Sequence, residues 1–217
     1  MLWNFGRTGD GRYPSATVTI GADGALYGTT SGGGSGCSSG CGLVFKLVPS
    51  ASGYSKSVLY KFRGGDDGSV PDSLTIDAAG ALYGVTDFGG GTTCAAGYGC
   101  GILFKLTPSA SGFSERVLWS FGKGTDGYYP QSNVFLGPRG KLYGTAWQGG
   151  THYAGTLYEL VPAGSGYTEK VLINYDGGVD GGDPRGNLIA DVKGRIFGTT
   201  YVGGSSQFDG TVFRFTP

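Results

Sequence analysis

A motif that recurs four times along the chain constrains its fold more than any other feature of the sequence. The segment Leu26–Thr29 (LYGT) returns as LYGV, LYGT and IFGT at residues 82–85, 142–145 and 196–199. A second marker, Asp-Gly-x-x-Pro, begins at Asp10, Asp67, Asp126 and Asp180, with spacings of 57, 59 and 54 residues. Two independent markers that recur at nearly the same spacing over four copies define a tandem repeat, in which each copy is one structural unit. We place the approximate repeats at residues 1–57, 58–116, 117–170 and 171–217.

Each copy carries short runs of β-branched and aromatic residues bounded by Gly, Pro, Asp or Ser, and this pattern predicts four β-strands per copy. One such set of predicted strands is Leu74–Asp77, Ala81–Thr86 and Ile102–Thr107 of the second copy, followed by Arg116–Phe121 at the start of the third. A proline follows each third strand, and we expect pairing to stop there because proline lacks the N–H that a sheet needs. No stretch shows helical periodicity, so the predicted fold class is all-β.

Tandem four-stranded antiparallel units predict a β-propeller with one blade per repeat, forming a single domain over residues 1–217. The fourth copy supplies three strands, and the strand that it lacks corresponds to Met1–Phe5. Pairing of this N-terminal strand with the last blade would cover two sheet edges and close the ring. We therefore predict a closed four-bladed propeller. The alternative is half of a larger propeller assembled from two chains.

Composition narrows the partners that we expect. The 16 basic and 16 acidic residues give a formal net charge of zero, which argues against nucleic acid and anionic membranes as partners. No apolar run approaches the ~20 residues that would span a bilayer. Met1 stands where the other copies have valine, and we expect any export signal to have been removed from this chain.

One face of the predicted propeller collects the loops that vary between copies. These loops follow the second and the fourth strand of each repeat, whereas the loops after the third strand repeat almost verbatim (PSASGY and PSASGF). Variable loops on a repeated frame are where binding usually resides. The candidate ligand-binding residues on this face are Arg12, Tyr13, Tyr128, Tyr129, Trp147, His152, Tyr153, Arg185 and Tyr201.

Aromatic rings mixed with amide and charged groups suit a sugar, because the rings stack on its apolar faces while the polar groups bind its hydroxyls. The alternative interpretation is that these aromatic side chains cover the glycine-rich loops. Carbohydrate is the leading ligand class.

Four cysteines fall in the loops before the third strands of the first two copies. We predict the disulfides Cys37–Cys41 and Cys94–Cys100, and therefore an oxidising compartment. Spacings of three and five intervening residues do not match the two-residue knuckles of structural zinc, so we expect no metal among them.

No other motif strongly indicates a catalytic or metal-binding site. The G-x-S-x-G match around Ser38 lies between two predicted strands rather than on a strand-to-helix turn, and nothing places His152, the only histidine, in a triad. The four aspartates of the Asp-Gly-x-x-Pro motifs could surround a cation, but the chemistry of Asp-Gly favours a turn. We expect no cofactor, and no recognised ligand spacing indicates calcium. Two carboxylates on different blades could lie close together and act as the pair that a glycosidase needs, so glycoside cleavage is an alternative function.

The units LYGTTSGGG…GCGLVFKLVPSASGY and LYGVTDFGGG…GCGILFKLTPSASGF resemble the GloVer repeat (Gloeobacter/Verrucomicrobia type) of bacterial choice-of-anchor tandem-repeat proteins. The resemblance covers essentially the whole chain and is strongest in the first two copies. It implies export and display at the cell surface, and it brings no catalytic residue with it.

The sequence therefore predicts a secreted or cell-surface binding module that takes carbohydrate, or another small ligand, through the variable loop face. An enzyme, either a glycoside hydrolase or a polysaccharide lyase at the same face, is the second hypothesis. A structural or adhesive module that contacts a protein partner is the third.

Overall fold

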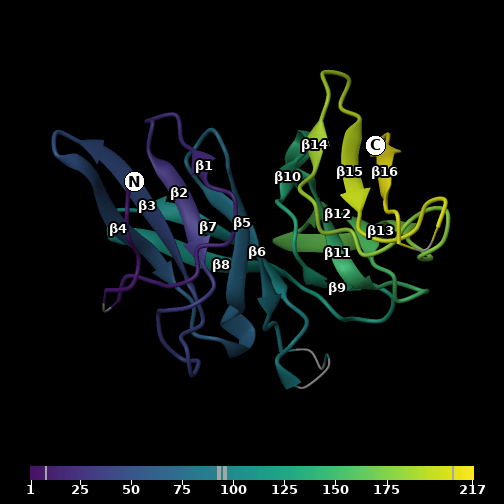
Figure 1. The fold of residues 1–217 in the computed structure, drawn as a ribbon, viewed down its shortest axis with the longest axis horizontal. Coiled ribbons are helices and arrows are strands. Elements are labelled where there is room, and N and C mark those ends of the chain that lie inside the picture. The colour runs from purple at the N-terminus through teal and green to yellow at the C-terminus, as the bar shows by residue number, and fades with distance from the viewer. Residues whose placement is uncertain (8, 92–93, 95–96, 207) are drawn as a thin grey trace.

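The protein is an all-β arc of four sheets, each built from antiparallel strands (Figure 1). The computed structural model describes residues 1–7, 9–91, 94, 97–206 and 208–217. We call the sheets blades 1 to 4 in chain order. Blade 1 has the strand order β1 (Thr19–Ile20), β2 (Leu26–Thr30), β3 (Leu43–Ser50) and β4 (Gly53–Lys61). Blade 2 has the order β5 (Ser69–Ile76), β6 (Leu82–Phe88), β7 (Ile102–Ser109) and β8 (Gly112–Ser120).

Blades 3 and 4 repeat this meander with two variations. In blade 3 the inner strand is split into two pieces, both of which pair with β11. Blade 3 contains β9 (Gly127–Pro130), β10 (Phe135–Leu136), β11 (Leu142–Gly149), β12 (Thr156–Ala163) and β13 (Gly166–Asn174). Blade 4 is a three-stranded sheet of β14 (Ile189–Ala190), β15 (Ile196–Thr200) and β16 (Thr211–Phe215). Among the described residues, single-turn 3-10 helices at Gly65–Asp67 and Pro138–Gly140 lie in the connections.

The glycine of each LYG motif is required by a close approach between neighbouring strands. Gly28 lies opposite Phe45 in the β2–β3 register, and a Cβ on Gly28 would stand 2.6 Å from the Phe45 ring. Gly84 meets Phe104 in the same way in blade 2, also at 2.6 Å. A side chain at either position would displace the ring, so the motif is set by packing within the blade.

The hydrophobic cores lie between successive blades. Val44 and Tyr27 of blade 1 cluster with Leu74, Leu82 and Phe104 of blade 2. Equivalent clusters join blade 2 to blade 3 and blade 3 to blade 4. A ring pair repeats at each junction: Phe62–Phe104 at 5.0 Å, Phe121–Tyr158 at 5.0 Å and Tyr175–Phe213 at 5.5 Å between centroids. The repeat is thus stabilised by contacts between its copies, as expected for units that cannot bury a face alone.

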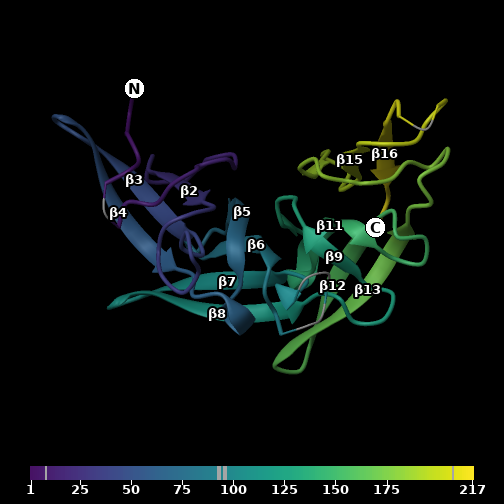
Figure 2. The same ribbon diagram turned by 60° about the horizontal axis from the view of Figure 1, so that its bottom comes forward.

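The predicted pairing of Met1–Phe5 with the last blade is not formed in this structure. Residues 1–5 belong to no strand, and they lie against blade 1, far from β16 (Figures 1 and 2). The physical reason is that Phe5 packs on Phe45 at 5.0 Å and 61°, as Phe62 packs on Phe104 at 5.0 Å and 67°. The segment therefore occupies the place that the last strand of a preceding blade would take, and the arc stays open.

The expectation that prolines stop the third strands is also wrong. Strand β3 runs through Pro49 to Ser50, and Pro49 lies opposite Tyr54 in the β3–β4 hairpin. The pairing of β3 with β2 ends at Leu47. Pro49 therefore needs no N–H on that side, because no strand lies there to accept a hydrogen bond.

Candidate ligand site on the loop face

The residue before each Asp-Gly-x-x-Pro proline has a left-handed backbone in all four copies. The φ angles are 59° at Tyr13, 60° at Val70, 57° at Tyr129 and 52° at Asp183. Non-glycine residues rarely adopt this conformation, and it persists only where the surroundings hold it. In three copies the backbone N–H donates to a carbonyl of the preceding blade: Val70 to Cys41 (2.9 Å), Tyr129 to Cys100 (2.8 Å) and Asp183 to Ala154 (2.8 Å). We call this repeated bond the junction latch.

The proline of each junction latch packs on a glycine of the preceding blade. A Cβ on Gly42 would stand 2.4 Å from Pro71 Cδ, and one on Gly101 would stand 2.6 Å from Pro130 Cδ.

Both predicted disulfides are confirmed, Cys37–Cys41 and Cys94–Cys100, each with 5.1 Å between Cα atoms. Cys41 and Cys100 are the residues whose carbonyls accept the latch bond. The disulfides therefore fix the loops on which the next blade is seated.

The residue after the proline of each Asp-Gly-x-x-Pro motif contributes to one polar pocket, which we call the axial pocket. Ser15, Asp72, Gln131 and Arg185 occupy this position in the four repeats, and all four line the pocket. Its volume is about 270 Å³. The remaining lining residues are Ala16, Thr17, Ser73 and Asn187. Hydroxyl, amide, carboxylate and guanidinium groups thus converge on one space from all four blades.

Two carboxyl groups beside the axial pocket are electrostatically coupled. Burial raises the pKa of Asp87, the charge of Asp72 adds to the effect, and together they bring the pKa of Asp87 to about 7. Gln131 Nε2 opposes this shift by donating to Asp87 Oδ2 at 3.2 Å. Burial also raises the pKa of Asp72. A carboxyl group that titrates near neutral pH can donate or accept a proton.

A row of stacked side chains runs beside the axial pocket across blades 3 and 4. The Tyr129 and Trp147 rings are stacked, with 5.9 Å between centroids and 30° between planes. The Arg185 guanidinium carbon lies 4.2 Å from the Trp147 ring centroid and 5.3 Å from that of Tyr201. Tyr128 meets Tyr129 edge to face at 5.1 Å. Arg185 is therefore held between two aromatic rings while it also lines the pocket.

The structure brings together five of the nine predicted ligand-binding residues. Tyr128, Tyr129, Trp147, Arg185 and Tyr201 form the stacked row. Tyr129 is only 8% exposed, so it supports the row from beneath, whereas Tyr201 is 69% exposed. Tyr153 is exposed and lies near enough to Tyr128 to influence its titration.

The other predicted residues lie apart from this row in the contacts of the described residues. Arg12 lines a separate glycine-rich hollow of blade 1 with Gly33, Gly34 and Ser38. Tyr13 lies over Gly32 in the same blade. His152 is exposed, and no contact among the described residues joins it to the row.

The candidate residues predicted from the sequence do not include Asp72, Asp87, Gln131 or Asn187. Asp72 and Gln131 share their position with Arg185, directly after the proline of the repeat. That shared register was the signal that could have found them, because equivalent positions of a ring of blades converge near its axis.

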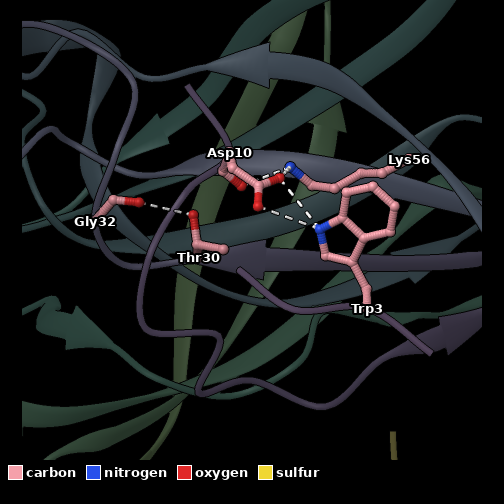
Figure 3. A network of polar contacts seen from close by, with 5 residues as sticks. All are labelled: Trp3, Asp10, Thr30, Gly32 and Lys56. Carbon is pink, nitrogen blue, oxygen red and sulfur yellow. Dashed lines mark hydrogen bonds and ion pairs between the residues drawn. The ribbon is translucent and has the colours of Figure 1, made fainter. Parts of the chain in front are cut away.

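Asp10 and Asp67 of the Asp-Gly-x-x-Pro motifs bind residues at the outer edge of blade 1, and neither lines the axial pocket. Asp10 Oδ1 accepts hydrogen bonds from Lys56 Nζ at 2.7 Å and from Trp3 Nε1 at 3.2 Å (Figure 3). Asp67 Oδ2 accepts from the Arg63 backbone N–H at 2.7 Å, and Asp67 also binds the Tyr60 hydroxyl. Over the described part of the chain, no three or more His, Cys, Asp or Glu side chains cluster as a metal site would require.

The repeat geometry and the loop-face site define a propeller-like repeat protein of the all-β class. A family model, the Gloeobacter/Verrucomicrobia repeat, matches residues 90–217, so the chain belongs to that family. No curated protein matches the sequence.

Two solved structures with a similar fold come from Bacteroides thetaiotaomicron. An endo-arabinase matches with a TM-score of 0.51 and 15% identity, over 96% of this chain and 77% of its own. The extracellular domain of a candidate one-component system matches with a TM-score of 0.52 and 14% identity, over 93% of this chain. The chain spans only 21% of the length of that second protein. At these identities the likeness shows the fold alone.

Proposed function

We propose that the protein is a carbohydrate-binding module whose ligand enters the axial pocket and stacks on the aromatic row beside it. The observation that carries the proposal is the position of Arg185, which lies between the rings of Trp147 and Tyr201 and also lines a pocket shared by all four repeats.

The chemistry of the site suits a polyhydroxylated ligand. Ser15, Ser73, Gln131 and Asn187 offer hydroxyl and amide groups that can both donate and accept hydrogen bonds. The exposed Tyr201 ring gives a flat apolar surface at the edge of the same space. A volume of about 270 Å³ is just below the range of about 300 to 1,000 Å³ for small-ligand pockets, so it would hold one sugar unit rather than a long chain.

We further propose that the module acts outside the cytoplasm. Two disulfides support this location, because they persist in oxidising compartments. One fold neighbour is an extracellular domain. None of the described helices is long and apolar enough to cross a membrane.

Glycoside cleavage is the second candidate function, and one specific observation favours it. The coupled carboxyl groups of Asp72 and Asp87 adjoin the axial pocket, and the pKa of Asp87 is raised to about 7. A glycosidase needs one carboxylic acid that is still protonated near neutral pH and a second that is ionised. The endo-arabinase neighbour is an enzyme that acts on a polysaccharide.

A glycan array probed with the labelled protein, followed by calorimetric titration of the best glycan, tests the binding proposal. We expect binding that Trp147→Ala weakens at least tenfold, because the ring and the support of Arg185 are lost together. His152→Ala is the matched loop-face control and should bind like the wild type.

An array without any hit, or a hit that Trp147→Ala leaves unchanged, contradicts carbohydrate binding at this site. Release of reducing ends from the bound glycan, abolished by Asp87→Asn, would instead establish the hydrolase. A protein partner captured without any glycan signal would establish the adhesive module.

A further inference from the structure

The axial pocket differs chemically between its two sides. The residue after the motif proline is Asp72 in blade 2 and Arg185 in blade 4, and both line the pocket. The third residue after the glycine of the LYG motif (IFG in blade 4) is Asp87 in blade 2, Trp147 in blade 3 and Tyr201 in blade 4. Blade 2 therefore brings two carboxyl groups to this space, whereas blades 3 and 4 bring a guanidinium group in contact with two rings.

Arg185 has hydrogen-bond donors to spare. Among the described residues that line the axial pocket, it is the only one with a cationic side chain. A guanidinium carries five N–H donors. The ion pair that Arg185 forms joins its Nη2 to Asp183 Oδ2 at 3.5 Å, which is longer than the roughly 2.7 to 2.9 Å of a strong charge-assisted hydrogen bond. The pocket thus holds a charged donor group without a close acceptor in the described part of the protein.

The carboxyl groups of blade 2 do not neutralise this cation. Asp72 Oδ1 accepts hydrogen bonds from the backbone N–H and the hydroxyl of Ser73, at 2.8 and 3.3 Å. No hydrogen bond or ion pair among the described residues joins Asp72 or Asp87 to Arg185. Burial raises the pKa of both carboxyl groups, that of Asp87 to about 7, and this weakens their repulsion of an anion bound at Arg185. A ligand therefore meets charged donors on one side of the pocket and carboxyl acceptors on the other.

We propose that the sugar bound in the axial pocket is a uronic acid, with its carboxylate on Arg185 and its hydroxyl groups toward Asp72. This inference rests on the proposed carbohydrate-binding function and names its ligand class. A planar carboxylate matches the fork of N–H groups on a guanidinium, and ring hydroxyls donate to a carboxyl group. A neutral sugar offers nothing charged to Arg185, and an amino sugar brings a second cation into the same small space.

Calorimetric titration of the wild-type protein with matched methyl glycosides tests the inference. The probes are the glucuronide and the galacturonide, their neutral parents the glucoside and the galactoside, and the two uronamides, in which an amide replaces the carboxylate. We expect one uronide to bind about 10- to 150-fold more tightly than its neutral parent and its uronamide, because its hydrogen bonds to Arg185 join two charged groups. The comparison needs no variant of the protein.

Substitutions of Arg185 then assign the preference to its guanidinium. Arg185→Gln keeps an amide donor without the charge and should reduce the preference for the uronide to within about twofold. Arg185→Lys keeps the charge without the fork of donors and should retain part of the preference. Arg12→Gln, at the exposed arginine of the separate blade 1 hollow, is the matched control and should retain all of it.

Neutral parents that bind as tightly as the uronides would overturn the assignment of a uronic acid and leave the carbohydrate-binding function standing. A preference for the uronide that Arg185→Gln leaves unchanged would also overturn it, as would tighter binding of methyl glucosaminide than of the glucuronide. A glycan array that carries both uronic and neutral sugars and gives no hit would contradict the proposed function itself, and this inference with it.

Discussion

The loop ends of blade 1 and of blades 3 and 4 carry the same kinds of residue, yet among the described residues only the second region brings them together beside the axial pocket. Arg12 lines a glycine-rich hollow of blade 1 and Tyr13 lies over Gly32, and no ring contact among the described residues involves either of them. Arg185 of blade 4 lies between Trp147 and Tyr201 and lines the axial pocket.

Register within the repeat explains the difference between the two regions. Arg12 precedes Pro14 of its Asp-Gly-x-x-Pro motif by two residues, whereas Arg185 follows Pro184 directly. In all four repeats the residue directly after the proline lines the pocket, and in blades 2 to 4 the latch fixes the backbone on the loop side of the proline. Position in the repeat, rather than residue type or loop exposure, therefore decides which of these side chains line the axial pocket.

The largest expected contrast concerns two tyrosines with the same left-handed backbone. Tyr129→Ala should destabilise the protein by about 3 to 5 kcal/mol, because a ring that is 8% exposed is lost from the stacked row. Tyr13→Ala should cost less than about 1 kcal/mol, because Tyr13 is 67% exposed. Urea unfolding measures both values, and equal losses would erase the distinction between the regions.

Acid and base should affect the two regions in opposite directions. The pKa of Asp87 is raised in the fold, from 3.8 to about 7, so its contribution to stability is fully present below pH 4 and is lost as the pH rises through 7. Burial likewise raises the pKa of Glu115 and of Glu169 to about 7. In blade 1, burial acts to raise the pKa of Asp10, but the hydrogen bond from Lys56 acts in the opposite direction and the pKa is lowered overall. The contribution of Asp10 to stability is therefore lost only as the pH falls below 4.

Unfolding experiments at pH 5 and pH 8 should therefore show a less stable wild type at pH 8. Asp87→Asn should reduce the difference by about 2 kcal/mol, because the amide stays neutral at both values. Asp180→Asn, at an exposed aspartate, is the control and should not change it. A wild type that is more stable at pH 8 than at pH 5 would contradict the environment assigned to Asp87.

The disulfides should support the junctions without taking part in the site. Replacing Cys37 and Cys41 by alanine should cost about 2 kcal/mol, since short loops gain little entropy from a bridge. The loop of blade 3 has Ala154 at the same latch position and needs no bridge. Ligand affinity, measured by titration of the variant, should stay within a factor of about two. A large loss of affinity would place the blade 1 hollow within the site.

The smallest expected effect is at the outer end of the row. Tyr201→Ala should weaken glycan binding about fivefold, equivalent to about 1 kcal/mol of ring contact, and Tyr201→Phe should bind normally. The same change at Tyr13 should leave the titration curve unaltered. If Tyr13→Ala weakened binding more than Tyr201→Ala, the ligand would lie on blade 1.

The repeat, the strand pattern and both disulfides could be predicted from the sequence, because LYG, Asp-Gly-x-x-Pro and the paired cysteines are local signals. Five of the nine candidate residues lie together in the stacked row, and their part in ligand binding stays a prediction. Closure of the ring could not be predicted, since Phe5 fits the Phe45 ring whether or not Met1–Phe5 also pairs with β16. Asp72 and Gln131 look unremarkable in the sequence, and only the shared axis of the four copies gives them a role.

Calorimetric titration of the array-selected glycan into Arg185→Ala and Arg12→Ala tests the central claim most directly. Hydrogen bonds from a charged group contribute about 1.5 to 3 kcal/mol, so Arg185→Ala should raise the Kd by about 10- to 150-fold. Arg12→Ala should leave the Kd within a factor of about two. Full affinity in Arg185→Ala, or a large loss in Arg12→Ala, would contradict a ligand site at the axial pocket.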